Sequence, residues 1–394
     1  MKKLAIISTH PVQYNAPWFQ LLAEKVTLKV FYTWGQSHKG STYDPDFQQE
    51  IQWDIPLLTG YEYYFVPNTA RRPGSHHFRG IINPTLNKSV EEWNPDALLI
   101  LGWGVASHFR SLRYFHGKVP ILFRGDSTLL DEKLGLRKIM RRIFLTWLYR
   151  HIDYALYTGT HNKDYFLAHG VKQKQLIYAP HAIDNSRFEE PDDVYRQQAA
   201  DWRKELGIAD NELVILFAGK LEPKKNPFFL LELAKRLEGK PVKFVLVGNG
   251  RLEKSLREAA KADPRILFVD FQNQSKMPIV YRIADIFILS SRGPGETWGL
   301  GANEAMASGC VVMLSDMVGS AVDLVEQDRT GIIFGVDDLA LSTRFIEDLL
   351  ENNEKLKRMK LYSKDRIKHF NYSGILDAVL KALNTTWGNK PKME

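Results

Sequence analysis

The sequence from residue 286 to residue 309 reads IFILSSRGPGETWGLGANEAMASG. Its first four residues form an apolar run that predicts a short buried strand. A loop with four glycines and one proline follows, and residues 302–308 are then expected to form a helix that stops at Gly309. A strand, a glycine-rich turn and a helix start bring free backbone N–H groups to one point, which suits a phosphate. The stretch therefore predicts an α/β fold with an anion site where a strand ends.

Two carboxylates bracket this loop. Glu296 lies within it, and Glu304 lies eight residues further on, in the predicted helix. A carboxylate would repel a phosphate, so we expect both groups to accept hydrogen bonds from the neutral hydroxyls of a sugar or ribose. The alternative is that both are solvated surface groups at a strand–helix junction.

Strands and helices alternate on both sides of this stretch, which predicts parallel sheets covered by helices. A charge-rich segment, 185–212, separates two such halves and is a candidate domain boundary. We expect two doubly wound, Rossmann-like domains at 1–190 and 191–370, facing each other across a cleft. A helix and tail at 371–394 follow, and packing back onto the N-terminal domain is one arrangement for them. The expected strands lie at 3–8, 27–33, 97–101, 120–124, 154–158, 213–218, 242–247, 266–269, 286–289, 311–314 and 331–334.

The composition is that of a globular protein, with 44% hydrophobic and 25% charged residues among 394. The single cysteine, Cys310, argues against disulfides and for a reducing compartment. The apolar run after Lys3 is too short for a signal peptide, and no run approaches the roughly 18 residues of a membrane span. We therefore expect a cytoplasmic protein.

Two further loops follow predicted strands of the second half. One contains Gly219, Lys220 and Lys225, and its two lysines are expected to reach a diphosphate. The other contains Gly248 and Asn249. An ordinary basic loop and an ordinary turn are the alternatives. Because carboxyl ends of parallel strands share one sheet edge, all these loops are expected to meet.

The order of these motifs resembles the C-terminal half of glycosyltransferase family 4, which comprises retaining sugar transferases of the GT-B architecture. The first half supports the likeness with the motif from Pro180 to Asp184, followed by Phe188. The resemblance is strong across 213–335 and looser before residue 180.

The resemblance implies a role for each matching residue. Lys220 and Lys225 would hold the diphosphate of a nucleotide-sugar, Glu296 the donor sugar's hydroxyls, and Glu304 the ribose hydroxyls. No metal ion or cofactor is implied. Backbone amides near Gly299 and Leu300 would add to the diphosphate contacts, and the loop from Asp270 to Gln274, with Phe271 and Gln272, would lie against the base. Further expected donor-binding residues are Gly219, Gly248 and Asn249.

Two departures accompany the resemblance. Where many members have a glycine-rich turn after the first strand, this chain has a turn beginning at His10. Where the family has an active-site histidine, this chain has Arg124 and Asp126. We expect Arg124 to supply positive charge near the donor and Asp126 to orient the acceptor or accept its proton. The alternative is that the pair only holds a loop, and His10 and His108 are other candidates for the cleft.

An acidic pair and a basic helix complete the list of candidates. Asp44 and Asp46 match the metal-holding Asp-x-Asp pattern of a different transferase fold, but no third ligand is in view, so we set them aside. Residues 133–150 carry six Lys and Arg and no acid, with an apolar stripe at helical spacing. The stripe is typical of a core face, or of a peripheral enzyme on anionic lipid. The stripe comprises Leu136, Ile139, Met140, Ile143, Phe144, Trp147 and Leu148.

These observations predict a glycosyltransferase that moves a sugar from a nucleotide-sugar to a glycan or lipid-linked acceptor in surface-polysaccharide or glycolipid synthesis. Loose attachment to the inner face of the cell membrane fits such acceptors. Nucleic acid is a poorer partner, since no aromatic stacking platform accompanies the basic residues. The alternatives are a nucleotide-sugar epimerase of the same architecture and a non-catalytic sugar-nucleotide-binding protein.

Overall fold

The computed structural model describes residues 1–35, 42–44, 49–189 and 192–388. These form two compact units, and the chain passes between them more than once. The first unit comprises Met1–Thr42, Ile55–His181 and Tyr372–Glu394; the second comprises Tyr43–Asp54 and Ala182–Asn371. The chain passes from the first unit to the second between His181 and Ala182, just ahead of the charge-rich segment 185–212. It contains α6 (Asn185–Glu189) and α7 (Asp192–Glu205).

The first unit is built on a seven-stranded sheet of order β5-β2-β1-β6-β7-β8-β9, and every pair in it is parallel. Its interior strands are nearly continuous apolar runs, as expected for a sheet covered on both faces. The short strands β5 and β9 at its edges were not expected from the sequence. The strands are β1 (Lys3–Ser8), β2 (Thr27–Tyr32), β5 (Glu62–Phe65), β6 (Ala97–Leu101), β7 (Ile121–Arg124), β8 (Tyr154–Tyr157) and β9 (Leu176–Tyr178).

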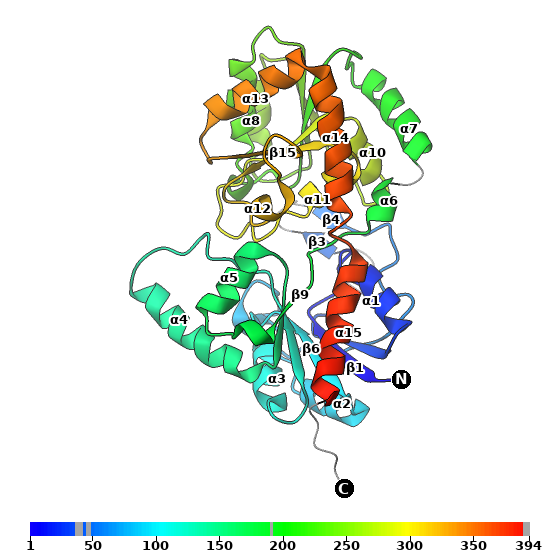
Figure 1. Ribbon diagram of the computed structural model, residues 1–394, viewed down its shortest axis with the longest axis vertical. Coiled ribbons are helices and arrows are strands. Elements are labelled where there is room, and N and C mark those ends of the chain that lie inside the picture. Colours follow the sequence, from blue (N-terminus) through cyan, green and yellow to red (C-terminus); the bar gives the residue numbers. More distant parts are fainter. Residues whose placement is uncertain (36–41, 45–48, 190–191, 389–394) are drawn as a thin grey trace. The chain divides into compact units, whose positions relative to one another are not determined.

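Helices cover this sheet, and one comes from the far end of the chain (Figure 1). α15 (Tyr372–Gly388) contacts β8, β9 and α1. Lys2 Nζ also donates to Asn384 Oδ1 at 2.9 Å, so the two ends of the chain meet in this unit. The other helices of the unit are α1 (Ala16–Ala23), α2 (Leu86–Trp93), α3 (Ala106–Phe115), α4 (Leu136–Leu148) and α5 (Thr160–Ala168).

The second unit contains a six-stranded parallel sheet of order β12-β11-β10-β13-β14-β15. The strand order reverses between β10 and β13, the point where doubly wound sheets bind ligands. The strands are β10 (Leu213–Ala218), β11 (Val242–Val247), β12 (Ile266–Val269), β13 (Ile286–Leu289), β14 (Val311–Ser315) and β15 (Gly331–Phe334). All six match expected strands to within a residue.

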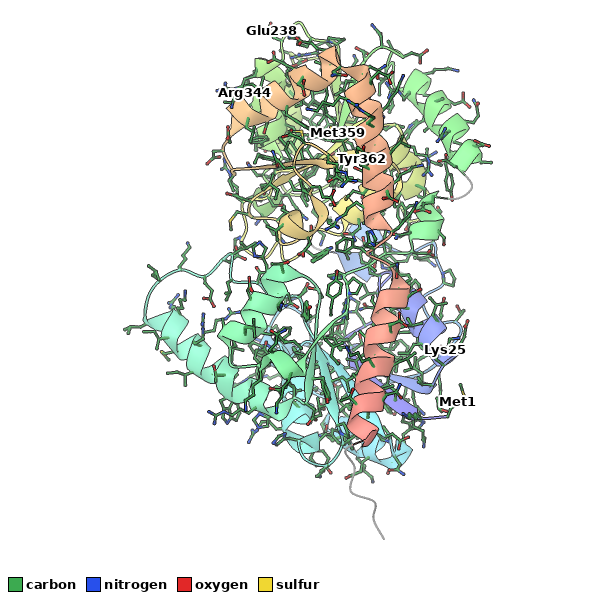
Figure 2. The ribbon with its side chains drawn as sticks, viewed as in Figure 1. Met1, Lys25, Glu238, Arg344, Met359 and Tyr362 are labelled. Carbon is green, nitrogen blue, oxygen red and sulfur yellow. The ribbon has the colours of Figure 1, made fainter. Side chains whose placement is uncertain are left out.

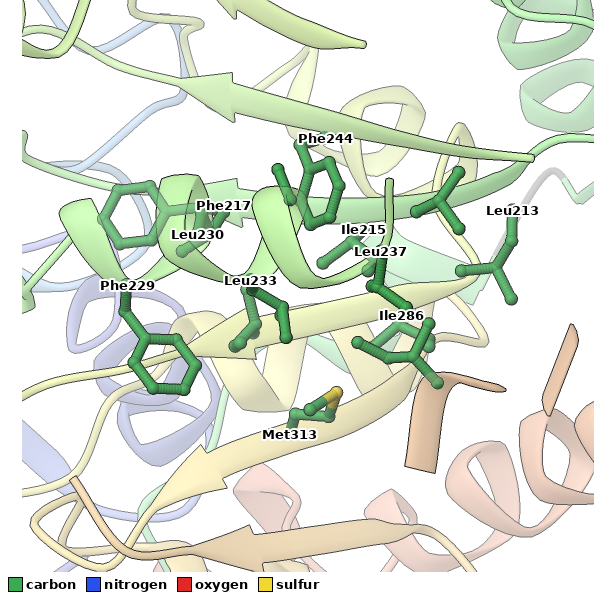
Figure 3. Packing of buried hydrophobic residues seen from close by; sticks show 14 of the residues in the cluster. Leu213, Ile215, Phe217, Phe229, Leu230, Leu233, Leu237, Phe244, Ile286 and Met313 are labelled. Atoms are coloured by element: carbon green, nitrogen blue, oxygen red, sulfur yellow. The ribbon is translucent and has the colours of Figure 1, made fainter. Parts of the chain in front are cut away.

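One face of this sheet is covered by α8 (Phe228–Arg236). Figure 3 shows Phe229, Leu230 and Leu233 of this helix packed over apolar residues of the sheet strands. Their spacing of one, three and four residues puts them on one side of the helix. The remaining helices are α9 (Glu253–Ala260), α10 (Met277–Arg282), α11 (Gly301–Ala307), α12 (Ala321–Leu324), α13 (Leu339–Glu351) and α14 (Asn353–Ile367).

Candidate active site

The predicted diphosphate loop and the predicted sugar loop meet in the second unit. Lys225 ends a short 3₁₀ turn, Pro223–Lys225, and its Nζ lies 2.5 Å from Oε2 of Glu296. The same carboxylate oxygen accepts a hydrogen bond from Ser291 Oγ at 3.0 Å. Both partners of the ion pair are largely buried, with side-chain exposures of 18% and 6%. The structure therefore joins the two residues that matter most to the sequence-based hypothesis.

Backbone contacts explain why these loops meet. β10 and β13 are hydrogen-bonded neighbours, with Ile215 opposite Ile286, so the loops that follow them leave the sheet side by side. Ser290 Oγ donates to the carbonyls of Lys225, at 3.2 Å, and Asn226, at 3.0 Å. The expectation that both loops lie at one edge of the sheet is confirmed.

Glu304 lies in the first turn of α11 and is only 3% exposed. Its Oε2 accepts a hydrogen bond of 2.7 Å from Tyr281 Oη, on α10. Tyr281 is thus a positioning residue that the sequence gave no reason to select, because nothing in the spacing relates positions 281 and 304. A contact between Glu304 and a ribose remains a prediction.

The turn between the two glutamates leaves no room for a side chain at Gly299. Gly299 has φ +88°, and a Cβ there would lie 2.7 Å from Leu289 Cδ2 and 3.1 Å from Val318 Cγ1. Leu300 follows as the residue that precedes α11. Glycine therefore allows the backbone to run tightly over the end of β13.

The loop after β11 also approaches the diphosphate loop closely. Gly248 has φ +128°, and a Cβ there would lie 2.2 Å from the carbonyl oxygen of Gly219. The backbone contact continues as Leu221 N donates to Asn249 O at 3.0 Å. Lys220 lies half-buried between these two contacts.

Asn249 organises its neighbours through its side chain. Its Nδ2 donates to Glu253, at 2.9 Å, and to Asp270, at 3.2 Å, while its Oδ1 accepts from the backbone N–H of Phe271 at 2.8 Å. Gln272 Nε2 donates to the carbonyl of Asp270 at 3.0 Å. Asn249 thus holds the loop expected to face the base.

A segment from the first half of the sequence covers part of this loop. The ring of Trp53 packs edge-on against Phe271, with centroids 6.5 Å apart. Asn273 Nδ2 donates to the carbonyl of Gln52 at 2.6 Å, and the backbone N–H of Ser275 lies 3.2 Å from both carboxylate oxygens of Asp54. Sequence reasoning missed this contact, since residues more than 200 positions apart give no local signal.

The first-unit candidates Arg124 and Asp126 lie just after β7. The guanidinium of Arg124 donates to the carbonyls of Ala179, at 2.8 Å, and Pro180, at 3.0 Å. Burial lowers the pKa of Arg124 to about 10, against the opposing effect of Asp126. This arrangement matches the alternative in which the pair holds a loop, and a catalytic role for either residue stays a prediction.

The histidine candidates differ in burial. His108 is 1% exposed and bonds through Nε2 with Thr33 Oγ1, at 2.9 Å, and through Nδ1 with the carbonyls of Leu101 and Gly102. It therefore holds the turn after β6. His10 is only partly buried, and its Nδ1 lies 3.0 Å from Thr9 Oγ1.

The helix expected over 133–150 forms as α4, but it does not bury its apolar stripe. Only Leu145 and Leu148 are buried, while Leu136, Ile139, Met140 and Ile143 are between 58% and 79% exposed. The core-face interpretation is therefore wrong for most of the stripe. Phe144 and Trp147 lie half-exposed against Phe109 of α3, and Arg142 of α4 donates to the carbonyl of Ala168, the last residue of α5.

The described residues contain neither a metal-binding cluster nor a membrane-spanning helix. No group of three or more His, Cys, Asp or Glu is placed to hold a metal ion among them. None of their helices has the length and apolar character needed to cross a bilayer. The side chains of Asp44 and Asp46 lie outside the described residues.

The chain contains two doubly wound parallel sheets, and the loops at the switch point of the second sheet pack closely together. This arrangement is the GT-B architecture. Solved structures superpose on nearly the whole chain. HepE of Anabaena, in complex with UDP, superposes with a TM-score of 0.75 over 98% of this chain and 100% of its own, at 16% identity. Sucrose-phosphate synthase of Thermosynechococcus elongatus gives 0.72 over 99% of this chain, at 16% identity.

Sequence comparison gives a family model that matches most of the second unit. Residues 198–366 match the family model described as glycosyl transferases group 1. The D-inositol 3-phosphate glycosyltransferase of Gordonia bronchialis is 27% identical over 46% of this chain and 42% of its own length. The GalNAc-α-(1→4)-GalNAc-α-(1→3)-diNAcBac-PP-undecaprenol α-1,4-N-acetyl-D-galactosaminyltransferase of Campylobacter jejuni is 23% identical over 68% of each chain. The chain spans about half the length of several curated relatives that it matches.

Proposed function

We propose that this protein is a retaining glycosyltransferase that moves a sugar from a nucleotide-sugar donor to a glycan or lipid-linked acceptor. The observation that carries the proposal is the contact between Lys225 and Glu296 at the switch point of the second sheet. It places a cation for the diphosphate beside a carboxylate for the sugar. The matched family and the relatives with lipid-linked acceptors support the same activity.

The chemistry follows from charge. Breaking the sugar–phosphate bond leaves a negatively charged diphosphate, and fixed positive groups stabilise that charge as it develops. Lys225, joined by Lys220, supplies these groups in the proposal, so the diphosphate needs no metal ion. In the ligand-free protein Glu296 neutralises Lys225, which lowers the cost of keeping an ammonium group largely buried.

When a donor binds, one diphosphate oxygen would approach Lys225 and a sugar hydroxyl would donate to Glu296. Ser291 already donates to Glu296 and would hold its orientation during this exchange. Glu304, oriented by Tyr281, would accept from the ribose, and the loop of Phe271 and Gln272 would lie against the base. UDP is the first nucleotide to test, since HepE was solved with UDP.

The donor can be found by measuring the melting temperature of the full chain with a panel of nucleotides and nucleotide-sugars, because a ligand that binds only the folded state raises it. Donor consumption is then followed with and without acceptors. Turnover that needs an acceptor supports the transferase; conversion of the donor alone indicates an epimerase; binding without any turnover indicates a non-catalytic binding protein. The anomeric configuration of the product, read by NMR, tests retention.

We further propose that α4 attaches the enzyme loosely to anionic lipid at the inner face of the cell membrane. Its exposed apolar residues form one face, and Arg137, Lys138 and Arg141 lie on the same helix. Such a basic helix with a bare apolar face has the chemistry of an interfacial anchor. This placement brings the active site to where lipid-linked acceptors are found.

A further inference from the structure

A basic cavity lies in the second unit, away from the loops described above. We call it the α14 pocket; its volume is about 510 Å³. It is lined by residues of α7 and α14, by the end of α10, and by the turn at Ser308 and Gly309. Ala284 precedes β13 and Ser308 precedes β14, so the pocket lies at the amino ends of these strands. Glu296 follows the carboxyl end of β13, at the opposite edge of the sheet.

α14 presents different faces to the core and to the pocket. Met359 is 2% exposed and belongs to the core cluster, whereas Tyr362 is 41% exposed, and Figure 2 labels both on this helix. The pocket is lined by positions 357, 360, 361 and 364 of the same helix, whose spacing puts them on one side. Three of these four residues are lysines.

The charges that line the pocket are strongly unbalanced, with one carboxylate, Asp192, against six cations. Asp192 contacts Arg282 at 2.9 Å, Arg196 at 2.6 Å and Lys364 at 3.5 Å. Burial would raise the pKa of Asp192, but the hydrogen bond from Arg282 and the nearby positive charges lower it below its usual value. The six cations are Arg196, Arg203, Arg282, Lys357, Lys360 and Lys364.

Carboxylates outside the lining remove only part of this excess. Asp285 contacts Lys360 at 2.5 Å and Arg203 at 3.7 Å, and Glu354 contacts Lys357 at 2.8 Å. Six cations against three carboxylates leave three positive charges around one cavity. Like charges held this close repel one another, and a bound anion would relieve that repulsion.

Not all six cations are available to a ligand. The guanidinium group of Arg203 donates to the carbonyls of Ile283 and Glu212. That of Arg282 donates to the carbonyls of Pro278 and Glu189, so both arginines hold the fold together. The other cations are more exposed. Arg196 and Lys357 are 67% and 61% exposed, and Lys360 and Lys364 are about a third exposed.

A buried hydroxyl group adds a second, independent sign of a ligand. Ser308 lines the pocket and is 8% exposed, yet its Oγ finds no hydrogen-bond partner among the described residues. A buried polar atom without a partner costs free energy, so such atoms are uncommon unless something else satisfies them. A hydroxyl among lysines suits a phosphate oxygen, to which both can donate.

We propose that the α14 pocket binds a phosphate-bearing ligand with two or more negative charges, held by Arg196, Lys360, Lys364 and Ser308. Its volume falls within the range of small-molecule sites. Ala199, Ala200 and Leu361 form an apolar wall that would contact a non-polar part of the ligand. The phosphate could belong to a soluble metabolite or to a lipid headgroup. This site is separate from the proposed donor site.

Isothermal titration of the full chain with pyrophosphate tests the proposal. The donor site would also bind pyrophosphate, so the titration is carried out on the Lys225→Ala variant, in which that site is weakened. The test variant adds Arg196→Gln and Lys364→Gln, which remove two cations and leave Asp192 paired with Arg282. The control variant instead adds Lys368→Gln, an exposed lysine just after α14 that does not line the pocket.

We expect the test variant to bind pyrophosphate at least about tenfold more weakly, while the control is unchanged, since each lost charged hydrogen bond is worth about a factor of ten. Restoring charge with Arg196→Lys and Lys364→Arg should restore binding. Circular dichroism and melting temperature show that each variant is folded.

A second arm separates the two sources of phosphate. Flotation with vesicles of phosphatidylglycerol and phosphatidylcholine uses an Ile143→Glu background, which disables α4. Pocket-dependent flotation identifies a lipid headgroup, and pocket-dependent binding of pyrophosphate alone identifies a soluble ligand; either result supports the site. If the pocket substitutions change neither pyrophosphate binding nor flotation, the proposal is overturned.

Discussion

The ammonium group of Lys225 and the carboxylate of Glu296 lie 2.5 Å apart, although 70 residues separate them in the sequence. Their contact depends on β10 and β13 being neighbours at the centre of the second sheet. The pair is therefore the direct product of the strand order, and disturbing either member should affect donor chemistry before it affects the fold.

Replacing Lys225 with alanine should lower turnover by on the order of 10²-fold, the scale of losing one group that stabilises developing charge. Steady-state rates with the identified donor provide the measurement. Lys235→Ala is the matched control, since Lys235 lies on the exposed side of α8 and, among the described residues, pairs only with Glu232 at 2.7 Å. Unchanged turnover in Lys225→Ala would remove this residue from the mechanism.

Replacing Glu304 with glutamine should weaken donor binding by roughly 10- to 100-fold, as expected for a hydrogen bond to a charged group. The decisive comparison uses nucleotides that lack one ribose hydroxyl. Wild-type protein should discriminate against them, and the variant should not. Equal discrimination by both proteins would show that Glu304 does not contact the ribose.

Replacing Gly248 with alanine should destabilise the second unit. A Cβ there would meet the carbonyl oxygen of Gly219 at 2.2 Å, and φ is +128°. Gly239→Ala is the control, since Gly239 also has positive φ, +75°, but has nothing within 4 Å of its added Cβ. In urea unfolding we expect the control to lose about 1–2 kcal/mol of unfolding free energy, the cost of left-handed backbone alone. Gly248→Ala should lose clearly more. Equal losses of unfolding free energy in the two variants would mean that the two loops can separate at no cost.

Stability should fall as the pH is lowered from about 6.5 towards 4. Burial lowers the pKa of His108 to about 4, although hydrogen bonds to two backbone carbonyls oppose the shift. The unfolded chain keeps a histidine pKa near 6.5, so it binds more protons in this window, and the unfolding free energy falls by about 1.4 kcal/mol per pH unit. Above pH 6.5 this group contributes no slope.

Urea unfolding at pH 7 and pH 5 measures the effect. His108→Gln should be less stable at pH 7 but lose less stability on acidification. His181, whose pKa burial also lowers to about 4, supplies a remaining slope in the variant. Identical slopes in the two proteins would contradict the assignment to His108.

Attachment through α4 should depend on its exposed apolar residues. Ile143→Glu should abolish flotation with anionic vesicles at low salt, because it places a negative charge in the apolar face that would enter the lipid. Leu21→Glu, at an exposed position of α1, should float like the wild type. Absence of flotation in the wild-type protein would count against membrane attachment altogether.

The sheet of the second unit could be predicted because its strands are apolar runs ended by glycine-rich loops, as at Ile286–Leu289. The meeting of Lys225 and Glu296 followed from one rule, that parallel strands end at a common edge. The supporting contacts could not be predicted. Tyr281 reaches Glu304, and Trp53 reaches Phe271, only through tertiary packing that leaves no periodic trace.

The sequence also misled where a local pattern allows two environments. The stripe of α4 has the spacing of a core face, yet Leu148 is its only buried member, together with Leu145 outside the stripe. The charge-rich segment 185–212, a candidate domain boundary, contains α7, whose charges pair with a neighbouring helix, as in the contact of Asp192 with Arg282.

The return of α15 to the first unit has a consequence for synthesis on the ribosome. The first strand of the seven-stranded sheet begins at Lys3, but the helix α15 that covers part of this sheet begins only at Tyr372. The first unit therefore lacks the buried side chains of Ile375 and Val379 until α15 has emerged. The second unit, almost contiguous in the chain, can be completed first.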